Sequence, residues 1–431
     1  MFSSSALHLL LSLRKQIGYI LLGLLTLGFQ QISALETQSV WKWQSQPIPE
    51  LGFDLDTAQV IRVTSLASEG EGTLREALAQ KGPRLIVFEV GGVIDLHMKS
   101  IKVTEPECFV AAQTAPSPGI TLIRGTLAIA SSRSAFQHLA VRPGDAGQPK
   151  KSGWSPDAIS TTGSPENVWI DHCSATWACD ENLSASTFKS PDNTFTRRIF
   201  IRDCLIAEGL HEASHPKGPH SKGSLIFEGS KEIAIVRCLY ASNVERNPVF
   251  KLNTSGVMVN CVIANPGERA IHASSPSAGS PPAARLSIVG NLVLFGEHSK
   301  RSARAIFEGT ADAFFKDNEG YDWFGQPLEL LRSPFPTALS PPVWPEGLDS
   351  RTPAAALWHV SRFVGAHPAR RSPIDSRIVQ SVLNGSAKII NSQEEVGGYP
   401  KSPETHRALN VPNQGRREWL LEFSKQAEGG L

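Results

Sequence analysis

The chain has 431 residues, and its 42 Lys and Arg nearly balance its 41 Asp and Glu. This balance, with basic residues scattered along the chain, argues against a nucleic-acid partner. The 35 Gly and 30 Pro call for many turns, as a fold of short strands requires, and the length allows one elongated domain.

The first 34 residues have the pattern of an export signal. Arg14 and Lys15 precede an apolar run at 17–27, and the small residues Ser33 and Ala34 follow. A membrane anchor is the alternative, but the run has only about half of the roughly 20 residues that a spanning helix needs. We therefore expect a signal peptide at 1–34 and a mature protein that is secreted or periplasmic, with no membrane partner.

The segment GEGTLREALAQ at 70–80 predicts a short amphipathic helix with Leu74, Ala77 and Leu78 on one face. A helix of this kind would cover the open first coil of a stacked fold. Strand-like runs separated by Gly and Pro follow at 85–90, 120–123, 127–130 and 139–141.

An apolar run that ends in cysteine then occurs four times: VWIDHC at 168–173, FIRDC at 200–204, IAIVRC at 233–238 and VMVNC at 257–261. The cysteines are 31, 34 and 23 residues apart, and LSIVGN at 286–291 places Asn291 where the next would fall. Repeats of this length with strand-like cores predict an all-β solenoid with parallel strands stacked on their own copies.

In such a solenoid the repeated cysteines would form an internal column. Neighbouring coils are about 4.8 Å apart, slightly more than the roughly 3.5–4.5 Å between the Cβ atoms of a disulfide. We therefore favour buried free thiols over the disulfides that cysteines in an exported protein otherwise suggest. Cys108 and Cys179 lie outside the column and stay unassigned.

We assign residues 35–296 to the solenoid and 297–431 to an irregular C-terminal arm packed on it, with one helix at 374–383. Polar excursions interrupt the ladder of repeats at 180–196, 208–223 and 240–249. In a solenoid such insertions emerge on one side and build the working surface.

Residues that could carry chemistry gather in these excursions and just before the first repeat. The acidic candidates are Asp145, Asp157, Asp180 and Glu181, and the basic ones are His211, His215, Lys217, His220, Lys222, Arg246 and Lys251. Carboxylates beside Lys and Arg suit an anionic polymer bridged by a hard cation, which prefers oxygen ligands. A solvated face with scattered ion pairs is the alternative.

Several segments together resemble the pectate lyase family of polysaccharide lyases, from about residue 59 to 400. They are GEGTLREAL, AAQTAPSPGITLIRG (111–125), VRPGD (141–145), SPDAIS (155–160), NVWIDHCSATWACDENLS (167–184), HPKGPHSKG (215–223), ERNPVFK (245–251) and EEVGGYP (394–400). WIDHC combined with RNP at its spacing is the specific part. The family's fold is a right-handed parallel β-helix, which agrees with the ladder of repeats.

The resemblance implies calcium-assisted β-elimination on polygalacturonate, an anionic plant cell-wall polysaccharide. A base removes the proton α to the uronate carboxylate, and Ca²⁺ stabilises the developing charge. The family's base is the arginine of an R-x-P segment, which is Arg246 here. Guanidinium normally holds its proton, so the alternative is that Arg246 only clamps the carboxylate.

The resemblance also implies residues that bind substrate. Lys222 resembles the family's substrate lysine, and Lys251 falls where members often have a second arginine. We add Lys217 and His220 from the same excursion as substrate contacts.

For Ca²⁺, the resemblance implies Asp157, Asp180 and Glu181 as ligands. Asp157 matches one family aspartate, but Ser155 replaces the usual partner two positions earlier. The loss of this ligand would weaken the metal site or leave calcium to arrive with the substrate.

Alternative functions are a lyase on another uronate polymer or on esterified pectin, and a non-catalytic polysaccharide-binding β-helix. Ser155 favours the binding protein, whereas Arg246 and Lys222 together favour the lyase. The NTD, DD and GHG motifs of the hydrolases that share this architecture are absent from the sequence. We expect the protein to be a monomer.

Overall fold

The computed structural model describes residues 41–187, 194–301 and 305–429. Residues 43–431 group into one compact unit, and the description below concerns that unit. The expected signal peptide at 1–34 lies outside the described residues. Within the described ranges, no helix has the length and apolar character needed to cross a bilayer.

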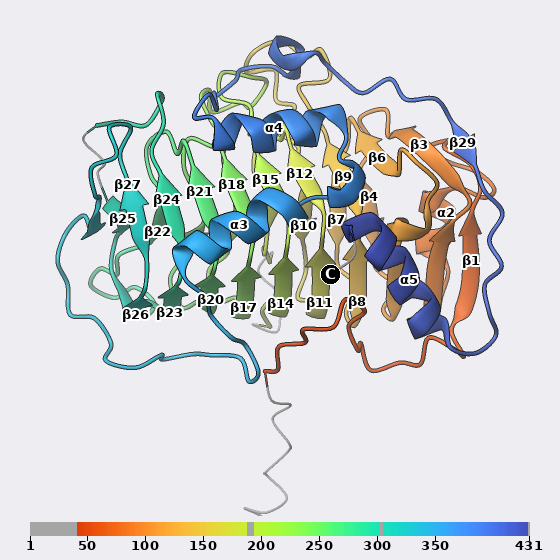
Figure 1. Cartoon of the computed structure of the whole chain (residues 1–431), viewed down its shortest axis with the longest axis horizontal. Coiled ribbons are helices and arrows are strands. Elements are labelled where there is room, and N and C mark those ends of the chain that lie inside the picture. Colours follow the sequence, from red (N-terminus) through yellow and green to blue (C-terminus); the bar gives the residue numbers. More distant parts are fainter. Residues whose placement is uncertain (1–40, 188–193, 302–304, 430–431) are drawn as a thin grey trace, which may run out of the picture. The chain divides into compact units, whose positions relative to one another are not determined.

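The unit is a parallel β-solenoid whose coils contribute strands to three faces, two of them formed by one long sheet each and the third by two shorter sheets (Figure 1). The first sheet has ten parallel strands: β1 (Gln59–Val63), β2 (Arg84–Phe88), β5 (Cys108–Ala111), β8 (Ser134–Gln137), β11 (Glu166–Asp171), β14 (Arg197–Arg202), β17 (Lys231–Val236), β20 (Ser255–Val259), β23 (Ala284–Val289) and β26 (Ala311–Lys316). The predicted solenoid is thereby confirmed.

The second sheet also has ten strands, all parallel except the last: β3 (Val90–Asp95), β6 (Ile120–Ile123), β9 (Leu139–Arg142), β12 (Ser174–Thr176), β15 (Leu205–Ala207), β18 (Leu239–Ala241), β21 (Val262–Ala264), β24 (Leu292–Leu294), β27 (Glu319–Tyr321) and the antiparallel β29 (Thr405–His406). The third face has two shorter sheets. One holds β4 (Ile101–Val103), β7 (Leu127–Ile129), β10 (Ile159–Thr161) and β13 (Leu183–Ser184), and the other β16 (Leu225–Ile226), β19 (Val249–Phe250), β22 (Ile271–Ala273), β25 (Ala305–Glu308) and β28 (Glu329–Leu331).

The repeated segments of the sequence lie in register in the first sheet. Trp169 pairs with Phe200, and the row continues coil by coil through Ala234, Val257 and Ser287. Alternate residues of each strand point inward, so the apolar positions of successive coils meet in one continuous core.

The predicted cysteine column is present. Cys173, Cys204, Cys238 and Cys261 are free and fully buried in the core cluster. Asn291 continues the column, since its Oδ1 accepts a hydrogen bond of 2.9 Å from the backbone N–H of Cys261. A buried amide needs partners on both its polar atoms, and Asn291 donates to the carbonyl of Met258 at 2.9 Å.

The predicted capping helix is α2 (Leu74–Ala79), which packs on β1 and β4. Thr73 caps it by accepting a hydrogen bond from the backbone N–H of Glu76. Leu74, Ala77 and Leu78 are the buried residues, as their spacing predicts.

The solenoid continues past residue 296, because β25 to β28 pair with the preceding coils. The boundary expected at 296 therefore falls inside the stacked strands. The apolar run of β26 ends without a cysteine, so the repeat pattern did not reveal it.

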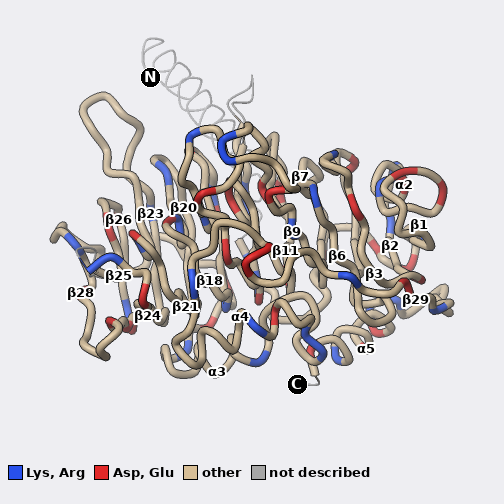
Figure 2. The backbone as a smooth tube through the Cα atoms, turned by 90° about the horizontal axis from the view of Figure 1, so that it is seen from above, with Lys and Arg blue, Asp and Glu red and all other residues tan. Residues whose placement is uncertain are grey.

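The C-terminal arm is more regular than expected. It contains α3 (Pro353–Phe363), α4 (Pro373–Leu383) and α5 (Arg416–Glu428), of which only α4 matches a helix predicted from the sequence. All three lie along one side of the stacked strands (Figure 2). Short 3₁₀ turns are η1 (Ala112–Thr114), η2 (Pro368–Arg370) and η3 (Gln393–Val396).

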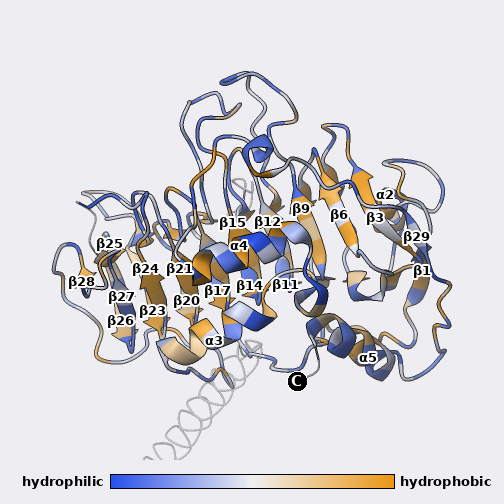
Figure 3. Ribbon diagram, turned by 45° about the horizontal axis from the view of Figure 1, so that its top comes forward, coloured by the Kyte–Doolittle hydropathy of each residue, from blue (hydrophilic) through white to orange (hydrophobic). Residues whose placement is uncertain are grey.

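The helices α3 and α4 cover the second sheet, whose strands are hydrophobic beneath them (Figure 3). Asp375 at the start of α4 anchors this contact, because its carboxylate accepts hydrogen bonds from buried Arg142 at 2.7 Å and from Ser174 at 2.8 Å. Leaving either charge of this pair without its partner would cost several kcal/mol, roughly 3–5.

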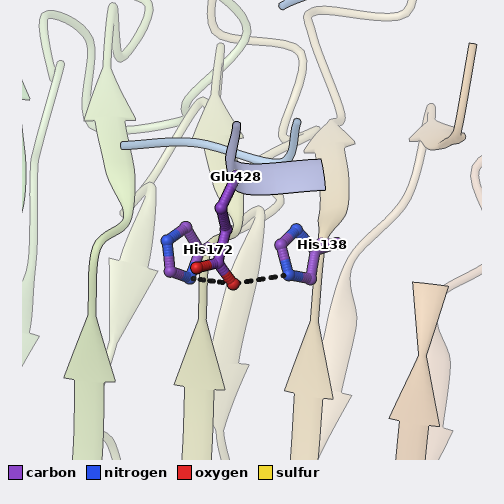
Figure 4. Close-up of side chains that lie close together, drawn as sticks. All are labelled: His138, His172 and Glu428. Carbon is purple, nitrogen blue, oxygen red and sulfur yellow. Dashed lines mark ion pairs between the residues drawn. The ribbon is translucent and has the colours of Figure 1, made fainter. Parts of the chain in front are cut away.

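The last helix is anchored by a buried carboxylate. Glu428 of α5 lies 3.6 Å from Nε2 of His138 and 3.9 Å from Nδ1 of His172 (Figure 4). The two imidazole rings stack with centroids 5.0 Å apart. Burial alone would lower the pKa of His172, but Glu428 and Asp171 outweigh it and raise that pKa to about 9.

Candidate functional site

The polar excursions meet at the corner between the second sheet and the third face. The loop after a second-sheet strand leads into the next short strand of the third face, so Asp157 precedes β10, Glu181 precedes β13, Lys222 precedes β16 and Arg246 precedes β19. Backbone bridges join Glu181 to Lys222 and Lys222 to Glu245. Coil stacking therefore sets residues far apart in sequence side by side.

Three carboxylates converge at this corner. Asp157, Asp180 and Glu181 each offer an oxygen, and these oxygens all lie within 4.8 Å of one another. The backbone N–H of Glu181 donates to Asp157 Oδ1 at 3.1 Å, which fixes the two coils against each other. An all-oxygen set of this kind fits a hard divalent cation such as Ca²⁺.

The electrostatics of the three carboxylates are uneven. Burial, together with the charge of Asp180, raises the pKa of Asp157 to about 7. Burial would also raise the pKa of Asp180, but hydrogen bonding and charge from His220, with His215, outweigh it and lower that pKa. Close packing of like charges in a partly buried corner is what a bound cation would relieve.

Arg246 reaches into the same corner and forms an ion pair with Glu181. Its backbone is in the left-handed region, with φ of 61°, as it enters the β19 coil. Burial lowers the pKa of the guanidinium, although the charges of Asp180 and Asp157 oppose this. The structure thus brings Arg246 together with all three predicted metal ligands.

Lys222 lies on the neighbouring coil and forms an ion pair with Glu245, with only 10% of its side chain exposed. Glu245 also faces Arg269 at 3.5 Å, and Arg269 contacts Glu308 at 3.1 Å. The corner therefore carries a row of alternating charges from Glu181 to Glu308.

Sequence reasoning missed Glu245 and Arg269. A signal existed: Arg269 follows Arg246 by 23 residues, the interval that also separates Cys238 from Cys261. Applying the repeat interval to the polar residues would have placed Arg269 one coil beyond Arg246.

The predicted substrate contact His220 takes a different position. Its Nε2 lies 2.8 Å from Asp180 Oδ1, and its ring stacks on His215 at 3.6 Å between centroids. His220 and His215 are both buried, so in this arrangement they hold Asp180 in place. Asp180, His215 and His220 form a second group with ligand atoms within 4.8 Å, but its nitrogens suit a hard cation less well.

The structure does not bring Lys217 and Lys251 into this cluster. Lys217 is exposed on its loop, and Lys251 is half-buried beyond the far end of β19. Across the described part of the chain, no ion pair or hydrogen bond joins either side-chain amine to the three carboxylates. Asp145 is also separate, since its carboxylate accepts hydrogen bonds from Ser392 and Gln393 of the arm.

Three buried asparagines form a hydrogen-bonded ladder beneath the charged side chains of the corner. Asn182 donates to Asn243 at 2.9 Å, Asn243 donates to Asn247 at 3.1 Å, and Asn247 donates to the carbonyl of Arg269 at 2.9 Å. All three asparagines are at most 1% exposed. Because Asn182 follows Glu181 and Asn247 follows Arg246, this ladder fixes the backbone that carries the charged side chains.

Comparison with known proteins gives relatives of one kind. No family model matches the chain. It is 27% identical over 351 residues to a protein of Aspergillus terreus described as "Probable pectate lyase C", covering 79% of this chain and 77% of that protein. A Neosartorya fischeri protein of the same description is 28% identical over 365 residues, covering 80% of this chain and 79% of the relative.

Among solved structures, the cedar pollen allergen jun a 1 shares the fold. Its TM-score is 0.52 at 14% identity, covering 70% of this chain and 88% of the allergen. At this identity the likeness concerns the fold alone.

Proposed function

We propose that this chain, whose resemblance to the pectate lyase family its relatives confirm, is a polysaccharide lyase that cleaves polygalacturonate by β-elimination. The observation that carries the proposal is the convergence of three carboxylates with Arg246 at one corner of the solenoid. Lys222 lies on the coil between those of Glu181 and Arg246, and Arg269 lies on the coil after Arg246, so the charged corner runs over several successive coils.

Asp157, Asp180 and Glu181 would hold Ca²⁺, and the bound ion would supply positive charge to the substrate carboxylate. The charge balance supports this requirement. The corner holds the carboxylates of Asp157, Asp180, Glu181, Glu245 and Glu308 against the cations of Lys222, Arg246, Arg269 and Arg332. Five acidic groups against four basic ones do not attract a polyanion, whereas an added divalent cation reverses the sign.

Arg246 is the proposed base. It removes the proton α to the uronate carboxylate, the electron pair of that bond forms a carbon–carbon double bond, and the glycosidic oxygen leaves and is protonated by water. Burial, which lowers the pKa of Arg246, makes its neutral form more accessible. Glu181 orients the guanidinium through the ion pair. In the alternative role, Arg246 donates paired hydrogen bonds to the carboxylate and another group takes the proton.

The test is incubation of purified protein with polygalacturonate, with Ca²⁺ or with a chelator, while ultraviolet absorbance of the unsaturated product is followed. We expect Arg246→Lys to lower the rate by about 10²- to 10⁴-fold, the range for loss of a positioned acid or base. Arg285→Lys is the matched control, because Arg285 is 57% exposed on the first sheet.

A near-full rate for Arg246→Lys would refute the base assignment. An equal rate in the presence of chelator would refute the calcium role. Activity only on esterified pectin or on another uronate polymer would change the substrate and keep the reaction class. If no product forms from any uronan, the remaining hypothesis is a non-catalytic polysaccharide-binding protein, which Ser155 favours.

A further inference from the structure

We propose that Trp323 and Phe324 form a second carbohydrate-binding subsite, which holds the same polymer at a distance from Arg246. The identity of the polymer rests on the proposed function. The subsite itself rests on three observations: the position of the two aromatic residues in the solenoid, their exposure, and the hollow beside them.

The aromatic pair lies in the same row of corner loops as Arg246. Arg246 follows β18, and Trp323 and Phe324 follow β27, which is three coils further along the second sheet. At about 4.8 Å per coil the separation along the stack is about 14 Å. A short run of linked sugars lying along the stack covers that distance.

The intervening loops are joined backbone to backbone. The N–H of Gly267 donates to the carbonyl of Asn243 at 3.2 Å, and the N–H of Lys300 donates to the carbonyl of Gly267 at 2.7 Å. A hollow of about 440 Å³ is lined by residues of these coils, among them Val244, Gly267 and Lys300. The corner surface therefore continues from the carboxylate cluster toward Trp323.

The two aromatic side chains are unusually exposed for their size, with 52% of Trp323 and 62% of Phe324 accessible to solvent. They line a hollow of about 180 Å³ together with Phe295, Glu297 and Arg301. Exposed apolar groups with a polar rim are typical of ligand-binding surfaces. The C–H face of a pyranose ring packs on an aromatic ring in the same way as other apolar groups.

The turn that carries them is held in a fixed conformation. Asp322 Oδ1 accepts hydrogen bonds of 2.9 Å from the backbone N–H groups of Phe324 and Gln326, and the N–H of Gly325 donates to the carbonyl of Asp322 at 2.9 Å. Such preorganisation reduces the entropy lost when a ligand stacks on the rings.

A cation completes the chemistry expected for a uronate. The guanidinium of Arg301 lies 5.7 Å from the centroid of the Phe324 ring. It can pair with the carboxylate of a sugar whose ring rests on the aromatic side chains. A neutral sugar would gain the stacking and lose this charge-assisted hydrogen bond.

The experiment uses the full-length protein with Trp323→Ala and Phe324→Ala. Its matched control is Trp358→Ala, since Trp358 is 50% exposed with Arg362 at 4.6 Å, but lies on α3 outside the corner loops. Migration is measured in native gels with and without polygalacturonate, followed by kinetics on long polymer and on trigalacturonate.

We expect Trp323→Ala and Phe324→Ala to weaken retardation by the polymer and to raise KM on long polymer by about three- to tenfold, with kcat and trimer cleavage unchanged. Trp358→Ala should behave as wild type. The subsite would be overturned if the polymer retarded the Trp323 and Phe324 variants as much as wild type. It would also be overturned if Trp358→Ala lost as much retardation as they do, or if they lost as much activity on the trimer as on long polymer. If the wild-type protein cleaves no uronan, the lyase proposal fails, and the gel measurement still decides the subsite.

Discussion

Asp157 is the carboxylate whose position depends most directly on coil stacking. It comes from a loop 23 residues before Asp180, yet its Oδ1 is bound by the backbone of Glu181 on the next coil. A carboxylate held in this way is prepared to coordinate a cation without large rearrangement.

We expect Asp157→Asn to lower calcium affinity by at least about tenfold, because one of three anionic ligands is lost. Isothermal titration with CaCl₂ measures this. Asp145→Asn is the control, since Asp145 bonds to the arm and lies outside the cluster. Equal affinity in Asp157→Asn and wild type would remove Asp157 from the metal site.

At the level of single residues, the sequence predicted the cluster of Asp157, Asp180, Glu181 and Arg246 because these residues stand in recognisable motifs. The sequence also predicted Lys217 and Lys251 as part of this site, but the structure does not bring either side chain into the cluster. Their side chains are set by loop geometry and strand length, and neither leaves a periodic signal. The pairing of His220 with Asp180 depends on how one long excursion folds back, which local patterns do not encode.

Among the elements, α5 has the least expected role. Its buried Glu428 pairs with His172 and lies 3.6 Å from Nε2 of His138, so the end of the chain contacts coils that lie far earlier in sequence. The helix was missed because only two of its buried residues, Leu420 and Ala427, are apolar, so its buried face gives a weak hydrophobic pattern.

This contact gives stability a pH dependence. The pKa of His172 rises from its ordinary 6.5 to about 9 in the folded protein, so its contribution is complete below about pH 6.5 and is lost as pH rises through 9. We expect wild type to lose on the order of 3 kcal/mol over this range through His172. In Glu428→Gln the loss should be smaller and the Tm lower at pH 6.5.

Thermal unfolding at pH 6.5 and pH 9 tests this expectation. Glu422→Gln on the same helix is the control, because Glu422 is 64% exposed and pairs only with Lys425. If Glu428→Gln keeps the wild-type slope of Tm against pH, Glu428 is not the group that raises the pKa of His172.

The column of buried cysteines is the clearest feature of the stacked strands that could be predicted from sequence. Six are buried and free, and burial raises the pKa of Cys108 and of Cys179 to about 12. We expect no reaction of the folded protein with a thiol reagent such as Ellman's, and six reactive thiols in denaturant. Fewer than six thiols in denaturant without reductant would show that disulfides form.

At the scale of the whole molecule, the solenoid could be predicted because each coil repeats the same unit. That unit is a short apolar strand that must bury one face against its copy on the next coil. VWIDHC and its later copies give the positions of β11, β14, β17, β20 and β23 in the first sheet, but not that of β26. The arm could not be derived in this way, because it packs once on the second sheet and has no repeat to reveal it.

The antiparallel strand β29 has a consequence for how copies of this protein meet in solution. Thr405 and His406 pair with Gly91 and Val90, and the N–H of Arg407 donates to the carbonyl of Glu89 at 2.8 Å. At this margin of the second sheet the backbone groups are already satisfied from within the chain. A neighbouring molecule finds no open ladder there to extend, so stacking of solenoids end to end into fibres is blocked at that margin by the chain's own C-terminal segment.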